Sequence, residues 1–260
     1  MKHHMDSLLL SIMMTCVAAA SGLVGSFALH RRMSLVADAF SHIALPGIGI
    51  ALLVNANPLY GGIAALSVGA LLIWALEEKT HLPTENIVGI IFTTALAAGA
   101  LLTPEHEILE VLFGGVQSVS LSEFFVSTSL GFIAIVAMIT MRDRLMLLAI
   151  SPEISQSMHI KRGVWNFLFL AVFSLTVILG LKFLGILLMG ALIIIPAAIA
   201  KMFSWNQRSD MILSSSFAMI AVNVGYFITK TYGLDLGPTI ALTCAGFFAT
   251  GLLLQLVMRK

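Results

Sequence analysis

Apolar and polar positions divide the chain into nine long apolar segments joined by short polar connections. A helix needs about 20 apolar residues to cross the hydrocarbon core of a membrane. Backbone polar groups in that core must be paired internally, and these segments lack the alternating polarity of barrel strands, so we predict helices. The expected spans cover residues 8–29, 34–55, 58–76, 86–102, 121–140, 164–181, 183–200, 211–229 and 238–257.

The sixth and seventh segments are separated only by Lys182. They form either a tight hairpin or parts of one broken helix, so the expected number of spans is about nine, within a range of eight to ten. The predicted fold is an all-α membrane protein, a polytopic helical bundle with one transmembrane domain over residues 1–260.

Composition supports a membrane protein and excludes several other classes. Of 260 residues, 59% are hydrophobic and 10% are charged, against about 25% charged residues in soluble domains. Mean hydropathy is +1.01. The net charge of +1 gives no indication of a nucleic-acid partner. The two cysteines, Cys16 and Cys244, lie in apolar segments and form neither a disulfide framework nor a thiolate metal site.

Basic residues predict the orientation of the spans. With the N-terminus outside, eleven of the 14 Lys and Arg residues fall on inner connections or at the C-terminus, and Lys2, Lys182 and Lys230 fall outside. We therefore expect a multi-pass protein of the cell membrane with its C-terminus in the cytoplasm. The first apolar segment follows no basic region and precedes no cleavage site, so it is interpreted as a retained span.

Asp38 and His42 are the acid and the imidazole that lie clearly inside a predicted span. Ionisable groups in a membrane are costly and are therefore candidates for function. Four residues apart, they lie within about 40° of each other on one helix face. A carboxylate and an imidazole suit a divalent metal. A structural hydrogen bond and a proton relay are the two alternatives.

Pro46 and Gly47 follow one turn after His42. Proline removes a backbone donor and kinks a helix, and glycine permits close approach. We expect a kink beside the metal pathway, with a simple packing kink as the alternative.

Two longer connections carry further candidate residues. In the inner connection, Ser151 can cap a short helix over about 151–160 with Pro152 at its first position. This helix either docks a cytoplasmic ATPase or merely connects two spans. The outer connection forms an acidic mouth that either attracts cations or is a solvated loop helix. Its candidate entrance residues are Glu105, His106, Glu107 and Glu110.

No glycine precedes a lysine anywhere in the chain, so the phosphate-binding loop of P-loop ATPases is missing. The chain is therefore predicted not to be an enzyme, and any ATP hydrolysis belongs to a separate chain.

Five stretches in order resemble the zinc/manganese/iron permease family of ABC importers. ADAFSHIALPGIGIALL resembles its motif of an Asp and a His four apart followed by Leu-Pro-Gly, with HRRMS before it. ENIVGIIFTTALAAGALL resembles its Gly-Ile-Ile-Phe helix, and EVLFGG its external turn. LKFLGILLMGALIIIPAAIAK resembles its Gly-Ala-Leu-Leu-Ile-Ile-Pro-Ala segment. The likeness extends from about residue 8 to the end.

The resemblance implies a type II-like ABC importer permease that acts as a homodimer. A cytoplasmic ATP-binding subunit and an extracytoplasmic solute-binding protein would be its partners. The pathway ligands of the family correspond to Asp38 and His42, and its coupling helix to 151–160, with Pro152, Glu153 and His159 as contacts. His159 stands where the family usually has glycine, and Gly115 where its external turn usually has a polar residue.

The predicted function is passage of a divalent transition metal (zinc, manganese or iron) along the dimer axis, with no permanently bound cofactor. The alternatives are a proton-coupled secondary metal transporter and an ABC permease for a bulky metal chelate.

Overall fold

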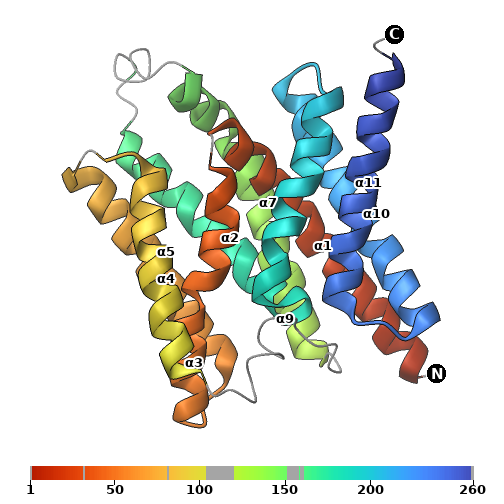
Figure 1. The fold of residues 1–260 in the computed structure, drawn as a ribbon, viewed down its shortest axis with the longest axis horizontal. Helices are drawn as coiled ribbons and strands as arrows, with labels where there is room; N and C mark the ends of the chain where they lie inside the picture. The colour runs from red at the N-terminus through yellow and green to blue at the C-terminus, as the bar shows by residue number, and fades with distance from the viewer. Residues whose placement is uncertain are drawn as a thin grey trace.

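The computed structural model describes residues 2–31, 33–80, 82–103, 120–150, 158 and 161–258. All regular structure within these ranges is α-helical (Figure 1). The helices are α1 (Lys2–His30), α2 (Ser34–Ile43), α3 (Leu45–Leu53), α4 (Pro58–Thr80), α5 (Thr84–Leu102), α7 (Leu121–Ile150), α9 (Arg162–Phe203), α10 (Gln207–Tyr232) and α11 (Leu236–Met258).

In the part of the chain that the structure describes, nine stretches are long and apolar enough to cross a membrane. Helices α2 and α3 together supply one of them, over Val36–Leu53. Helix α9 supplies two, over Arg162–Leu181 and Leu184–Phe203. The predicted all-α polytopic bundle of about nine spans is therefore confirmed.

The two spans of α9 form a hairpin. Gly185 has φ 71° and ψ 176°, a conformation in which a side chain would be strained. A Cβ added at Gly180 would lie 2.1 Å from Sδ of Met189. Nine residues along a straight helix are about 13 Å apart, so this contact requires the chain to double back between them. The sequence left a hairpin and a broken helix open, and the structure has the hairpin.

The break between α2 and α3 falls at Ala44, whose φ of −68° and ψ of −26° remain in the right-handed helical region. Pro46 occupies the second position of α3, where a helix needs no N–H donor. The hydrogen-bond ladder is thus interrupted one turn after His42, while the two short helices continue as one span.

Helix α1 is largely buried in the bundle, where it packs against α7, α9 and α10. Along α4, α5, α7 and α11, many large apolar side chains remain exposed, as expected of surfaces that face lipid or another protein. In Figure 1 the two chain ends lie at opposite ends of the bundle, as an odd number of spans requires.

Candidate functional site

Asp38 and His42 lie on α2, which packs between the two halves of α9. Phe40 contacts Phe173 of the first half, with ring centroids 5.0 Å apart, and Asp38 lies against Gly190 of the second half. Phe40 is fully buried, whereas the side chain of Asp38 is 49% exposed. Apolar packing therefore fixes α2 on both sides and leaves the carboxylate accessible.

The His42 ring is held in one orientation. Its Nδ1 lies 2.9 Å from the main-chain oxygen of Asp38, and its ring meets Phe92 of α5 edge to face, at 5.4 Å between centroids and 86° between planes. A carbonyl oxygen only accepts hydrogen bonds, so Nδ1 donates and the neutral ring carries its lone pair on Nε2. This tautomer leaves Nε2 as the nitrogen that can ligate a metal.

The carboxylate of Asp38 and the ring of His42 are close but not hydrogen-bonded to each other. Oδ1 of Asp38 lies 3.9 Å from Nδ1 of His42, beyond hydrogen-bond distance. The structural alternative expected a bond between the two side chains, and the ring bonds the main chain instead. Both side chains are thus positioned on one face, and their polar atoms keep capacity for another ligand.

One copy of the chain offers two ligands at this place. Among the described residues, no group of three or more His, Cys, Asp or Glu side chains could hold a metal ion. Divalent transition metals take four or more ligands. Waters or a second chain would have to complete the coordination of an ion at Asp38 and His42.

Gly47 brings α3 and α4 into direct backbone contact. A Cβ added at Gly47 would lie 2.0 Å from the main-chain oxygen of Gly61, and one at Gly61 would lie 2.0 Å from that of Gly47. The expected close approach is therefore present, beside the interruption of the helix before Pro46.

Asp210 is a buried carboxylate that the sequence analysis missed. It is 1% exposed and lies in the Gln207–Tyr232 span, where the sequence suggested a connection that ends at 210. The sequence feature that could have revealed it is Asn206. Its side chain accepts a hydrogen bond from the Ser209 amide and caps α10, so the helix begins four residues before the predicted boundary. Oδ2 of Asp210 accepts from Oγ of Ser26 at 2.7 Å.

A second polar network joins the start of α9 to two other helix ends. The side-chain oxygen of Asn166, a buried residue, accepts from the guanidinium of Arg31, and its Nδ2 donates to Oε1 of Glu77 at 2.9 Å. Oγ1 of Thr84 donates to the same oxygen at 2.9 Å. Burial lowers the pKa of Arg31, Glu77 counteracts this effect, and Arg162 adds to it.

Both networks lie at the end of the bundle where α1, α4 and α9 meet their neighbours, the upper end in Figure 1. The residues of the two networks come from four predicted inner connections or their flanking helix turns. Which side of the membrane it faces remains a prediction.

Two groups of predicted site residues lie outside the described residues. They are the entrance residues Glu105, His106, Glu107 and Glu110, and the coupling residues Pro152, Glu153 and His159. Their roles stay predictions.

The nine membrane-spanning stretches and the polar side chains buried among them define an α-helical polytopic membrane protein. Comparison with known families is more specific, because the model of the ABC 3 transport family matches residues 3–255. The chain belongs to this family. The resemblance to a family of metal permeases, inferred from five motifs, is confirmed at this level.

The chain is similar to several proteins along nearly its whole length. It is 27% identical over 248 residues to the manganese import system permease protein ScaB of Streptococcus parasanguinis, covering 94% of this chain and 89% of that one. It is 25% identical over 252 residues to the high-affinity zinc uptake system membrane protein ZnuB of Haemophilus influenzae, covering 95% of each. The fold matches a solved structure of PsaBC from Streptococcus pneumoniae in complex with Fab, with a TM-score of 0.80, 24% identity and coverage of 95% and 90%.

Proposed function

We propose that this chain is the membrane-spanning permease of an ATP-driven importer for a divalent transition metal, manganese or zinc in the first place and iron as a third candidate. Asp38 and His42 are the pathway ligands. A metal ion bound there passes to the cytoplasmic side when the partner ATPase changes the packing of the helices. The metal is substrate and does not stay bound.

The observation that carries this proposal is the geometry of His42. Its Nδ1–H is engaged by the main-chain oxygen of Asp38, so the neutral ring offers Nε2, while the carboxylate four residues earlier stays half exposed. A neutral imidazole nitrogen oriented through its other nitrogen is a typical metal ligand in proteins. The manganese and zinc permeases among the relatives agree with this substrate class.

Membership of the family and the incomplete ligand set of one copy support three further partners: a second copy of the chain, an ATP-binding subunit and a solute-binding protein. Two ligands in one copy support a homodimer in which two Asp38–His42 pairs face the same axis. A cytoplasmic ATP-binding subunit would dock on residues 151–160, through Pro152, Glu153 and His159. An extracytoplasmic solute-binding protein would deliver the ion near Glu105–Glu110, with the N-terminus on that outer side and the C-terminus in the cytoplasm.

The test is metal accumulation by cells that express this chain with its candidate ATPase, measured for manganese, zinc and iron at matched membrane expression. Asp38→Asn and His42→Ala are compared with Asp143→Asn, which removes an exposed carboxylate from α7. We expect one metal to accumulate only with the ATPase, and uptake to be lost in the first two variants but kept in the third. Uptake that survives in both pathway variants would show that Asp38 and His42 are structural.

A proton-coupled transporter gives a different result in the same assay. Its uptake needs no ATPase and collapses when a protonophore dissipates the proton gradient. Uptake with this signature would replace the importer proposal.

A further inference from the structure

We infer that Gly190 is a positioning residue of the metal site, because the absence of its side chain fixes where the carboxylate of Asp38 can lie. The inference rests on the proposed function, in which Asp38 ligates the metal. Gly190 belongs to the apolar GILLMGALIIIPAAIAK segment, which offers no ligand of its own.

Gly190 and Asp38 are in contact across the interface between α9 and α2. A Cβ added at Gly190 would lie 3.2 Å from Cα of Asp38, 3.2 Å from its Oδ1 and 3.4 Å from its Cβ. The Asp38 side chain thus lies directly over the glycine. Any residue other than glycine would force the carboxylate, the α2 backbone or the α9 backbone to move.

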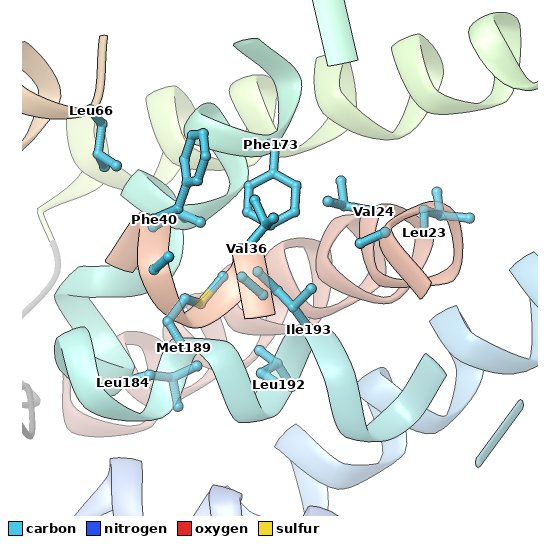
Figure 2. Packing of buried hydrophobic residues seen from close by; sticks show 14 of the residues in the cluster. Leu23, Val24, Val36, Phe40, Leu66, Phe173, Leu184, Met189, Leu192 and Ile193 are labelled. Carbon is cyan, nitrogen blue, oxygen red and sulfur yellow. The ribbon is translucent and has the colours of Figure 1, made fainter. Parts of the chain in front are cut away.

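The two backbones are poorly able to move. Gly190 follows Met189, whose fully buried side chain contacts Gly180 on the other half of the α9 hairpin. On the α2 side, Phe40 packs against Phe173. Figure 2 shows α2 enclosed by Phe173 on one side and by Met189 and Ile193 on the other. Side chains in such a core resist displacement. Rotation of the carboxylate can relieve the contact with Oδ1, whereas the contacts with Cα and Cβ of Asp38 can be relieved only by a small shift of α2 against α9. Either adjustment moves the carboxylate away from its present place.

A displaced carboxylate changes the ligand geometry. The proposed ligating atoms are a carboxylate oxygen of Asp38 and Nε2 of His42, whose ring is held through Nδ1, and zinc-to-oxygen distances are confined to about 2.0–2.2 Å. If the carboxylate oxygen moves by a few tenths of an ångström, its distance to an ion of given size leaves this range, and the ion binds more weakly. Gly190 accordingly sets both the affinity and the size selectivity of the pair.

The experiment measures metal binding to the purified full-length chain in nanodiscs, by isothermal titration with Mn²⁺ and with Zn²⁺. Gly190→Ala is compared with Gly89→Ala on α5, where an added Cβ meets nothing within 4 Å. We expect Gly190→Ala to weaken binding by about 10- to 100-fold, as changes to residues that orient ligands usually do. We also expect it to change the Mn²⁺ to Zn²⁺ affinity ratio, which a merely less stable protein would leave unaltered, and we expect Gly89→Ala to change neither quantity.

The other possible outcomes separate failure of the inference about Gly190 from failure of the proposed metal site at Asp38 and His42. If Asp38→Asn and His42→Ala abolish binding and Gly190→Ala behaves like Gly89→Ala, the inference about Gly190 is wrong and the metal site stands. If the Asp38 and His42 variants bind normally, the proposed function fails first. If Gly190→Ala does not fold, it is repeated in an Asp38→Ala background. Failure to fold there too would mean that Gly190 serves helix packing alone and would overturn the inference.

Discussion

Nζ of Lys201 lies 2.7 Å from Nε2 of His30, 171 positions earlier in the chain. An ammonium group only donates hydrogen bonds, so Nε2 accepts and the proton of the neutral ring is on Nδ1. Nδ1 lies 2.8 Å from the main-chain oxygen of Ser26 and 3.4 Å from Oδ2 of Asp210. The imidazole thus links a surface ammonium to a buried carboxylate and ties α1, α9 and α10 together.

Replacing Asp210 should therefore destabilise the bundle. Asp210→Ala removes the acceptor of Ser26 Oγ and the negative charge beside His30, and we expect a loss of about 1–3 kcal/mol in the free energy of unfolding. Unfolding in detergent, followed by circular dichroism, measures the loss. The control Arg208→Ala removes an exposed charge two residues earlier. Equal stability of the two variants would contradict the linking role.

Asn166 should matter more than its neutral side chain suggests. It is the hydrogen-bond partner of both Arg31 and Glu77, and the Arg31 guanidinium is partly removed from solvent by burial, which lowers its pKa. Asn166→Ala leaves a charged donor without its acceptor, which costs about 1.5–3 kcal/mol. The matched variant Asn86→Ala, at an exposed position of α5, should unfold like the parent protein. A common midpoint for the two variants would show that the network is dispensable.

The crossing of α3 and α4 permits a steric test. Gly47→Ala places a methyl group 2.0 Å from the main-chain oxygen of Gly61, and neither backbone can retreat without separating the helices. Overpacking of this kind costs about 1–3 kcal/mol. Gly89→Ala, which adds the same methyl group in open space, should be neutral. Thermal unfolding of both variants in one detergent makes the comparison, and a neutral Gly47→Ala would mean that the crossing is loose.

Much of the fold could be predicted from the sequence because a membrane allows few solutions. Long apolar segments have to be helices, and the spacing of Asp38 and His42 places both on one face. The hairpin within α9 could not be predicted, because a single polar residue, Lys182, between two apolar segments fits a reversal of the chain as well as a break in one helix. The contact between Gly180 and Met189 and the positive φ of Gly185 decide it.

The polar networks around Asp210 and Asn166 could not be predicted from the sequence for a related reason. Hydropathy finds where a span lies but does not show which helix turns are covered by neighbours. Asp210 sits only four residues after a cap, where exposure is the ordinary expectation, yet packing against α1 buries it. Gly190 gave no chemical signal at all, because its contribution is the space that it leaves for Asp38.

Protonation of His42 should control metal binding. The ion needs the lone pair on Nε2, so a metal ion and a proton compete for the same atom, and metal affinity should be weaker at about pH 5 than at about pH 8. Isothermal titration in nanodiscs across this range measures the slope. His42→Gln keeps an oxygen ligand but removes the titrating ring, so its weaker binding should depend much less on pH. Parallel slopes in the two proteins would show that another group carries the proton and that His42 is not a ligand.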